Sequence, residues 1–504
     1  MTAAREIALT GTGLTMADTV AIGEGRARIV LPSDALARVA ANRTAVEIAL
    51  AGGERIYGAG PMIAGGDAGL RPAQVEHDIV RGTAAGIGEP LPAAVARAAM
   101  AVRLNGLLLA RSGVRPALPE AIAALLNAGL APHVPARGSA GASGDLAPSA
   151  HAFLTLLGEG YILGADGTGK HPAADALAAH GLTPFTLAPK EAIAILNGTH
   201  FMTALGAVVS DRVARILDTA DAVAAMTIDA LRGFTAAFDL RVHALRPLPG
   251  QIRTAEVLRR LLSGSARVDS RTHELHDAYT LRCVPQVHGA ARHGHEFFSG
   301  TIAIDLNAAT DNPLIFDDPL EVVSAGNFHG QSLSLAFDVL RIALADLAAF
   351  SERRLFRLVS PSLNGDLPPF LVGADGRGLG YMVSQFACTT VVAELRVLAQ
   401  PVSIDTVPTL DNIEDHVSFG MTGGLLALQA CDLVETVLAI EAMAAAQALE
   451  TGPNPAPAVA ELRALFRETV PPASGTRPPA DDMAGAQAVL RSRVWADALG
   501  GLLD

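Results

Sequence analysis

The sequence contains few cysteines and no excess of positive charge. Its three cysteines, Cys283, Cys388 and Cys431, are far apart and form no C-x-x-C pair, which is typical of reduced thiols in a cytoplasmic protein. The 38 basic and 51 acidic residues give a net charge of −13. This balance argues against a nucleic-acid partner and against an anionic-membrane partner, and it favours a soluble protein.

Signals for export or membrane insertion are also lacking. The N-terminal stretch MTAAREIALTGTGLTMAD has no basic segment followed by an apolar one, and no run of about 18 uncharged apolar residues occurs elsewhere. We therefore expect a cytoplasmic chain without a signal or an anchor.

Aromatic residues and alternating β-type runs are scarce, whereas 50% of the residues are hydrophobic, mainly alanine and leucine. Residues 1–200 are punctuated by Gly and Pro, with short helical segments between them. Longer apolar segments follow, of the kind found in helices buried among other helices. We expect a mainly α fold with a loop-rich helical domain over 1–200 and a long-helix bundle with C-terminal helices over 201–504.

One glycine-rich stretch, GSAGASGDLAPSAH, runs from Gly138 to His151. It is no phosphate loop, because no Lys follows the glycines and no strand precedes them. Its glycine spacing also fails the dinucleotide fingerprint G-x-G-x-x-G. A hydrolase elbow, G-x-S-x-G, would need a glycine where Asp145 stands. What remains is a tight turn with small residues at its apex.

Two interpretations of this turn stay open on the residues alone. It is either a plain turn or a turn that closes a five-membered ring between the Gly144 nitrogen and the Ala142 carbonyl carbon. Loss of one water completes that ring, and loss of the Ser143 hydroxyl leaves an exocyclic methylene. The product would be a strong electrophile made only from backbone and one serine.

The surrounding chain carries a series of further motifs in a fixed order. They are IYG at Tyr57, AAGIG, LLGEG, LNGT, DAYTLRCVPQVHGA, LNAATDNPL, GNFHG, SERR, LPPFL and NIEDHVS, which ends at Ser418. With these motifs the chain resembles the histidine, phenylalanine and tyrosine ammonia-lyases over most of its length, although the C-terminal part carries little that matches. In that family Ala-Ser-Gly forms 4-methylideneimidazol-5-one. The resemblance therefore implies this prosthetic group, made from Ala142, Ser143 and Gly144, and no external cofactor.

The resemblance also implies a fold, an assembly and a reaction. The fold would be a fumarase/aspartase-like bundle of long helices with an N-terminal helical, loop-rich active-site domain. The assembly would be a homotetramer with active sites shared between subunits. The reaction would eliminate ammonia from an α-amino acid, because an electrophile captures the amine while a base removes the β-hydrogen.

By the same resemblance, four residues surround the substrate. Tyr57 matches the loop tyrosine that takes the β-proton, and its phenol needs activation because its reference pKa is about 10. Arg282 in YTLRC matches the arginine whose guanidinium fork holds the substrate carboxylate. Tyr279 and Asn197 match polar groups that line the site, where a hydroxyl and an amide can bond the amine, the carboxylate or the prosthetic group.

Three further residues would support the prosthetic group. Phe328 in GNFHG matches the aromatic residue beside the ring, and Asn327 either bonds the ring or shapes the loop. Asp145 matches an acid that supports cyclisation, with the N-cap of the following helix as its ordinary alternative.

Glu414 in NIEDHVS bears on the substrate, because histidine-type members carry an acid here and phenylalanine- and tyrosine-type members an amide. A carboxylate near an amine or an imidazole favours a cationic or hydrogen-bonding substrate. The ordinary alternative is an acid on a surface helix. His329 also favours the histidine type. We therefore expect L-histidine as the preferred substrate and urocanate as its product.

Four departures from the family pattern concern the substrate side. They are Thr83 in place of a His, His276 in place of a Gln, Ile413 in place of a Gln or an Asn, and Pro61 with Met62 in place of part of Thr-Gly-Phe-Gly. Our hypothesis is that ring recognition has moved from position 83 to His276, or that the substrate has changed. The alternatives are therefore a lyase or a 2,3-aminomutase for another aromatic amino acid, or a non-catalytic binding paralogue without the prosthetic group.

A histidine-rich segment, THELHD, stops short of the zinc motif H-E-x-x-H, because Asp277 stands at the second His position. We therefore expect no metal site here. Instead, we expect each histidine of this region to be either hydrogen-bonded inside the protein or exposed to solvent; these are His273, His276, His288, His293 and His295.

Overall fold

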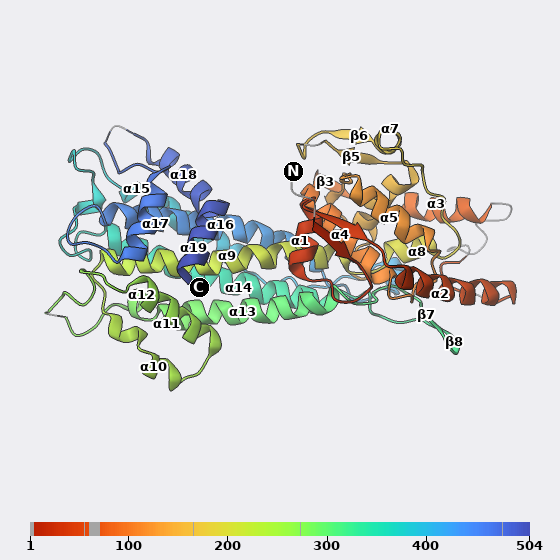
Figure 1. Ribbon diagram of the computed structural model, residues 1–504, viewed down its shortest axis with the longest axis horizontal. Helices are drawn as coiled ribbons and strands as arrows, with labels where there is room; N and C mark the ends of the chain where they lie inside the picture. Colours follow the sequence, from red (N-terminus) through yellow and green to blue (C-terminus); the bar gives the residue numbers. More distant parts are fainter. Residues whose placement is uncertain are drawn as a thin grey trace. The chain divides into compact units, whose positions relative to one another are not determined.

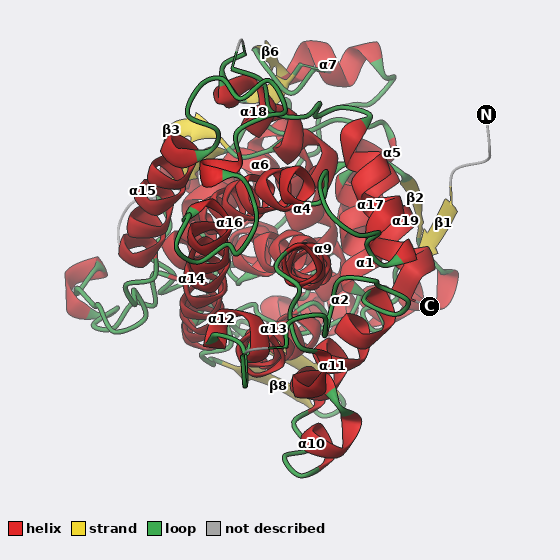
Figure 2. Cartoon of the chain, turned by 90° about the vertical axis from the view of Figure 1, so that its left-hand side faces the viewer, coloured by secondary structure: helices red, strands yellow, loops and turns green. Residues whose placement is uncertain are grey.

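A computed structural model describes residues 5–54, 56–59, 71–164, 166–272, 274–475 and 477–503. Helices dominate these residues, and the strands are short and paired in twos (Figure 2). The mainly α fold expected from the sequence is therefore confirmed. The chain forms two compact units, and it enters each of them three times.

The first unit contains Met1–Asp211, Phe298–Asp338 and Pro401–Leu425, and the second contains Arg212–Phe297, Val339–Gln400 and Leu426–Asp504. This division differs from the single boundary that is expected after residue 200. GNFHG and NIEDHVS, which lie late in the chain, belong to the first unit together with the glycine-rich stretch.

Short helices build most of the first unit before residue 200 (Figure 1). They are α1 (Met16–Gly23), α2 (Ser33–Ala51), α3 (Pro72–Thr83), α4 (Ala93–Leu107), α5 (Ala117–Asn127), α6 (Leu146–Leu154), α7 (Ala173–Ala179) and α8 (Glu191–Leu196). Small residues let α1 and α4 approach closely, because a Cβ added to Gly23 would lie only 2.5 Å from the carbonyl oxygen of Ala94.

The strands form small two-stranded sheets that connect loops. One pair is parallel, β1 (Arg5–Ala8) with β2 (Ala27–Val30). The antiparallel pairs are β3 (Ile87–Pro90) with β4 (Pro135–Arg137), β5 (Tyr161–Leu163) with β6 (Lys170–Pro172), and β7 (Leu314–Asp317) with β8 (Leu320–Val323). Two-stranded sheets have little stability of their own, so the fold depends on helix packing.

Long helices carry the apolar segments expected after residue 200. They are α9 (His200–Ala230), α13 (Val284–Asp305), α14 (Gln331–Val359) and α16 (Gly420–Ala448). The shorter helices of the second unit are α10 (Leu240–Ala244), α11 (Pro249–Leu261), α12 (Tyr279–Arg282), α15 (Met382–Leu398), α17 (Pro457–Arg467), α18 (Pro479–Arg491) and α19 (Arg493–Leu503).

A buried ion pair connects three of the long helices within the second unit. Arg354 of α14 and Glu441 of α16 are fully buried, and their two N–O distances are 2.6 and 2.8 Å. Thr227 of α9 donates a hydrogen bond of 2.7 Å to the same carboxylate. Because a buried charge without partners is costly, these contacts fix the register of the three helices.

By length and composition, α16 is apolar enough to cross a membrane. However, 61% of its most apolar stretch is buried inside the chain, and the helix carries the paired Glu441. Both properties are typical of a core helix.

Candidate active site

The turn formed by Ala142, Ser143 and Gly144 is pressed against Gly198. Gly144 has a φ of +77°, and a Cβ on it would lie 2.2 Å from the Gly198 carbonyl oxygen. The same oxygen accepts a hydrogen bond of 2.8 Å from the Asp145 N–H. The Gly198 N–H donates to the Ser143 carbonyl oxygen at 3.5 Å. Position 144 therefore requires glycine, both for its backbone conformation and for this close approach.

Two segments from late in the chain hold the other side of the turn. Ser418, at the end of NIEDHVS, donates from Oγ to the Gly141 carbonyl oxygen at 2.9 Å, and the Phe419 N–H donates to the Ala140 carbonyl oxygen at 2.9 Å. Gly330, at the end of GNFHG, donates to the Gly141 carbonyl oxygen at 3.4 Å. The first unit thus brings three separate motifs together at the small-residue turn.

Asp145 is fully buried directly after the turn. Its Oδ2 accepts from the Met202 N–H at 2.9 Å, and its Oδ1 accepts from the Ser139 hydroxyl at 3.0 Å. Asp145 occupies the N-cap position of α6, but its side chain makes no capping bond there and binds the first turn of α9 instead. Burial raises the pKa of Asp145 to about 7, so this carboxyl can exchange a proton near neutral pH.

Ser149 and His200, which no sequence motif marks as site residues, hold the Asp145 backbone. The Ser149 hydroxyl donates to the Asp145 carbonyl oxygen, and His200 Nε2 lies 2.8 Å from Ser149 Oγ. Because the Ser149 proton is used on that carbonyl, Nε2 of the neutral imidazole carries the ring proton. Burial, together with the charge of Arg103, holds the pKa of His200 well below its usual value. His200 is the residue directly after the motif LNGT, so a motif extended by one residue would have included it.

The Ser143 hydroxyl donates a hydrogen bond to Oε1 of Glu414. The other carboxylate oxygen of Glu414 accepts from Thr409 Oγ1 at 2.6 Å, and the two backbones pair at 2.9 and 3.3 Å. Glu414 lies in a loop after a 3₁₀ turn at Leu410–Asn412, so it is not an acid on a surface helix. The structure places this carboxylate on the serine that ring closure would consume.

Tyr57 is half exposed, and burial together with the negative charge of Glu414 raises its pKa. Both causes disfavour the phenolate, so nothing among the described residues around Tyr57 activates it as a base. Its loop is anchored at Gly58, which has a φ of +81° and accepts a hydrogen bond of 2.9 Å from the Lys190 N–H. A Cβ at Gly58 would lie 2.8 Å from Ile193 of α8.

Buried charges sit at both ends of α8, between the Tyr57 loop and Gly198. Lys190 is fully buried, and its Nζ lies 2.9 Å from Asp311 Oδ2. The same carboxylate oxygen lies 3.8 Å from Arg103 Nη2. The Nε and Nη2 atoms of Arg103 are buried without a hydrogen-bond partner among the described residues, and a Cβ at Gly198 would lie 3.2 Å from Arg103 Nη1. This cluster therefore supports α8 at its start and the small-residue turn Ala142–Gly144 at its end.

Glu76 of α3 completes the N-terminal end of α8. Its carboxylate accepts from the Lys190 N–H at 3.1 Å and from the Ala192 N–H at 2.8 Å. These are N–H groups that a helix leaves without partners in its own first turn. Burial raises the pKa of Glu76 to about 7, although both hydrogen bonds oppose the rise.

Three other predicted residues of the first unit lie beside the motifs already described. Asn197 is buried at the C-terminal end of α8, immediately before Gly198. Asn327 donates from Nδ2 to the Ala309 carbonyl oxygen at 3.2 Å, which shapes its loop. Phe328 follows it and is partly buried.

The positions that depart from the family pattern make few contacts within the first unit. Thr83 ends α3, and its Oγ1 donates to the Ile79 carbonyl oxygen at 2.7 Å, so its hydroxyl is used inside its own helix. The Ile413 side chain is 77% exposed. Pro61 and Met62 lie outside the described residues.

His276, Tyr279 and Arg282 belong to the second unit. Tyr279 and Arg282 form the one-turn helix α12, in which the guanidinium carbon lies 4.8 Å from the centre of the tyrosine ring. Tyr279 is 68% exposed, His276 is exposed, and Arg282 Nε is buried without a hydrogen-bond partner. This segment therefore keeps hydrogen-bonding capacity that none of the described residues uses.

Among the residues that the structure describes, no group of three or more His, Cys, Asp or Glu side chains could hold a metal ion. His288 is buried and bonded through Nδ1 to Asp221 at 2.7 Å. His293 Nε2 accepts from the Gly250 N–H at 3.2 Å. His273 lies outside the described residues.

Comparison with known proteins matches residues 14–468 to the family profile described as aromatic amino acid lyase. The chain is 44% identical over 488 residues to the histidine ammonia-lyase of Anaeromyxobacter dehalogenans, covering 93% of this chain and 95% of that one. The crystal structure of histidine ammonia-lyase from Trypanosoma cruzi has a TM-score of 0.90 at 33% identity, covering 99% of this chain and 95% of that one. Tyrosine aminomutase from Streptomyces globisporus has a TM-score of 0.93 at 33% identity, covering 98% of both chains.

Proposed function

Because the chain belongs to the aromatic amino acid lyase family and is a carbon–nitrogen lyase, we propose that it eliminates ammonia from L-histidine to give urocanate. The observation that carries this proposal is the position of Glu414, whose carboxylate binds the Ser143 hydroxyl within the small-residue turn. The resemblance assigns an acid at this position to the histidine type. Curated relatives named histidine ammonia-lyase, at 40–44% identity, support the same substrate.

We propose that Ala142, Ser143 and Gly144 condense to 4-methylideneimidazol-5-one, without an external cofactor. The Gly144 nitrogen bonds to the Ala142 carbonyl carbon, whose oxygen leaves as water, and the Ser143 hydroxyl leaves with the Cα hydrogen as a second water. The residues present fit this group, because Gly144 lies against Gly198 with no room for a side chain. The group supplies an electrophile that captures the substrate amine and makes it a better leaving group.

Asp145 and Ser139 prepare the turn for this condensation. Ser139 Oγ lies 3.0 Å from Asp145 Oδ1 and 3.3 Å from the Gly144 carbonyl oxygen, so it connects the acid with the ring-forming peptide. With its pKa near 7, Asp145 holds a proton for part of the time at neutral pH and releases it for the rest. Asn327 supports its own loop, GNFHG, by donating a hydrogen bond to the Ala309 carbonyl oxygen.

Tyr57 acts as the base at the β-carbon in this proposal, and it needs positive charge that its own surroundings do not supply. We propose that Tyr279 and Arg282 of the partner subunit complete the site in a homotetramer, with Arg282 on the substrate carboxylate. The unused Nε of Arg282 supports this role. Large apolar side chains more than half exposed on α13, α14 and α15 support burial between subunits; they are Ile304, Ile342, Val383, Phe386 and Val397.

We assign the remaining substrate contacts to Asn197, Phe328, Thr83, His276 and Ile413. Asn197 directly precedes Gly198, and Phe328 lies two residues before Gly330. The contacts of these two glycines with the turn support the assignments. Thr83, His276 and Ile413 would form the part of the pocket that meets the side chain of the amino acid. A 2,3-aminomutase for another aromatic amino acid is the second candidate, favoured by the similarity to tyrosine aminomutase and by these three departures.

We also propose a cytoplasmic location. Cys388 and Cys431 are free and buried, and burial raises the pKa of the Cys431 thiol to about 12. Such thiols are unreactive and form no disulfide, as in proteins of a reducing compartment.

A screen of L-amino acids for ammonia release, with identification of the product, tests the proposal. Urocanate and ammonia from L-histidine would support it. A β-amino acid formed without net ammonia would identify the aminomutase instead. No reaction, together with an intact mass equal to that of the unmodified chain, would identify a non-catalytic paralogue.

A further inference from the structure

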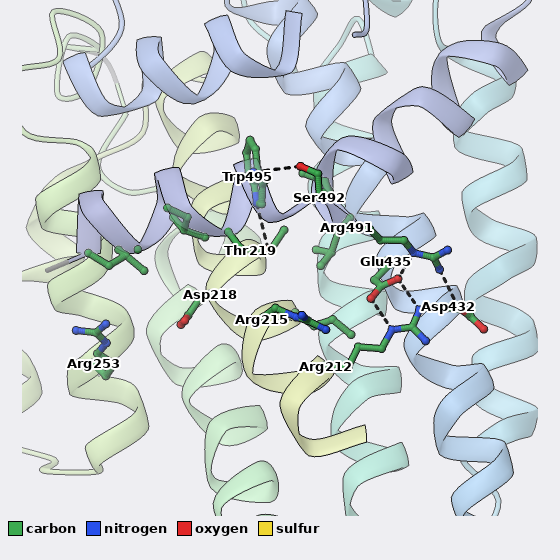
Figure 3. A pocket seen from close by; sticks show the side chains of 17 residues that line it. Arg212, Arg215, Asp218, Thr219, Arg253, Asp432, Glu435, Arg491, Ser492 and Trp495 are labelled. Atoms are coloured by element: carbon green, nitrogen blue, oxygen red, sulfur yellow. Dashed lines mark hydrogen bonds and ion pairs between the residues drawn. The ribbon is translucent and has the colours of Figure 1, made fainter. Parts of the chain in front are cut away.

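The second unit contains a cavity of about 510 Å³ between α9, α11, α16, α18 and α19 (Figure 3). None of the residues proposed for the lyase site lines it. Its walls from α18 and α19 begin at Leu490, beyond residue 468, where the match to the lyase family ends. The cavity is therefore formed in part by a segment that the family profile does not include.

One side of the cavity is apolar. Trp495, Leu499 and Leu503 line it from α19, facing Ile216 of α9 and Leu438 of α16. The Trp495 indole is fixed in place, because its Nε1 donates to Thr219 Oγ1 at 3.2 Å. A rigid apolar wall of this kind suits a ligand with a hydrocarbon body.

One end of the cavity is polar, but its charged side chains are already engaged with partners. Arg212 binds Glu435 at 2.7 and 2.6 Å. Arg491 binds Asp432 at 2.8 Å and also contacts Glu435. Arg215 also lines the cavity near this cluster and has a contact of its own. Because these charged side chains are already engaged, a charged ligand group would gain little there.

The opposite end carries a cation without a partner. Arg253 of α11 is exposed and lines the cavity, and no hydrogen bond or ion pair of its guanidinium occurs among the described residues. Figure 3 shows it well apart from the Arg212–Arg491 cluster. The nearby acid Asp218 is already bound to Arg292 at 2.8 Å. An anion entering this end would meet one available guanidinium, which suits a single carboxylate.

We propose that this cavity binds an amphiphilic monocarboxylate, with its hydrocarbon body against Trp495 and the leucines of α19 and its carboxylate on Arg253. The apolar wall supplies burial, the free guanidinium supplies orientation, and the already paired charges at the far end favour no second charged group. The volume lies within the range of small-molecule sites, about 300–1,000 Å³. This site is independent of the lyase reaction.

Trp495 makes the test specific, because it is the only tryptophan in the chain. Octanoate is titrated into the full-length protein, below its micelle concentration, while tryptophan emission is recorded. We expect a saturable change in emission. The neutral isostere octan-1-ol should bind at least about tenfold more weakly, since it lacks the charge that pairs with Arg253.

Arg253→Gln should weaken octanoate binding by about tenfold or more and leave octan-1-ol unaffected. Arg259→Gln is the matched control, because it removes an exposed arginine from the same helix that does not line this cavity. If octanoate changes neither the emission nor the heat in a calorimetric titration, the proposal is wrong. Equal octanoate affinity of wild type and Arg253→Gln would also overturn it, because the ligand would then bind elsewhere.

Discussion

The Ser143 hydroxyl and the Glu414 carboxylate form a hydrogen bond across 271 residues of sequence. This bond fixes the serine side chain in one rotamer before ring closure, and Thr409 fixes the carboxylate in turn. In the proposed mature site the hydroxyl has left as water, which frees Oε1 of Glu414 to accept a hydrogen bond from the substrate. One acid would therefore serve first the unmodified turn and later the substrate.

Ser143→Ala should abolish formation of the prosthetic group, because alanine has no hydroxyl to lose in the second dehydration. Intact-mass measurement should show the wild type lighter by two waters than its sequence and the variant without that full deficit. Ammonia release should fall by on the order of 1,000-fold or more, since the electrophile is missing. Ser360→Ala, whose hydroxyl bonds only its own helix, should keep both the mass deficit and the activity. A wild-type mass without the deficit would contradict the proposed cofactor.

Glu414→Gln should shift the pH dependence of the reaction. Glu414 contributes to the raised pKa of Tyr57, so removal of its charge lowers that pKa. If Tyr57 acts as phenolate, the rise of kcat/KM with pH should move to lower pH. The KM for L-histidine should increase about tenfold, because a charge-assisted hydrogen bond is lost. Asp415→Asn, at the exposed neighbouring acid, is the control. A profile that does not move would argue against Tyr57 as the base.

Glu76→Gln should make stability less dependent on pH. Burial raises the pKa of Glu76 to about 7 in the folded chain, so the folded state keeps a proton that the unfolded state loses. The free energy of unfolding therefore falls as pH rises from about 4.5 to about 7, by about 3 kcal/mol for this group. The variant should lack this part of the fall, measured by chemical denaturation at several pH values.

The matched control for this experiment is Glu120→Gln, at an exposed acid of α5. Asp145, whose pKa is also raised to about 7, adds a fall of the same sign that both variants retain. A Glu76→Gln variant whose stability follows the wild-type curve would mean that the Glu76 carboxyl is not held in its neutral form by burial.

Asp311→Asn should destabilise the protein more than Lys190→Met. The first change leaves the buried cations Lys190 and Arg103 without an anion, which costs about 3–5 kcal/mol. The second leaves Asp311 beside Arg103, whose unpartnered N–H groups can take over the contact. The double variant should recover part of the loss, as denaturation midpoints would show. Equal costs for the two single changes would mean that Arg103 does not compensate.

The sequence predicted the helices, the glycine-rich turn and the motifs that meet there, because each has a local pattern. It did not predict the support of the turn. Lys190 and Asp311 are 121 residues apart, and no local pattern marks them as a pair. Asp145 illustrates the limit of local rules. It stands at the N-cap position of α6, but its carboxylate accepts from the Met202 N–H instead. That N–H lies in the first turn of α9, where a helix leaves its N–H groups without partners.

His276→Gln tests whether the substrate ring is recognised from a new position. The change restores the glutamine of the family pattern at position 276. Position 83, where the family pattern has a histidine, is Thr83 in this chain, and its hydroxyl is bonded to the Ile79 carbonyl oxygen. We expect the KM for L-histidine to rise about tenfold with kcat changed less than about twofold, because a binding contact is lost and the electrophile is untouched. His180→Gln, at an exposed histidine next to α7, controls for loss of any imidazole. If KM and the ranking of amino acids both stay unchanged, His276 does not recognise the ring.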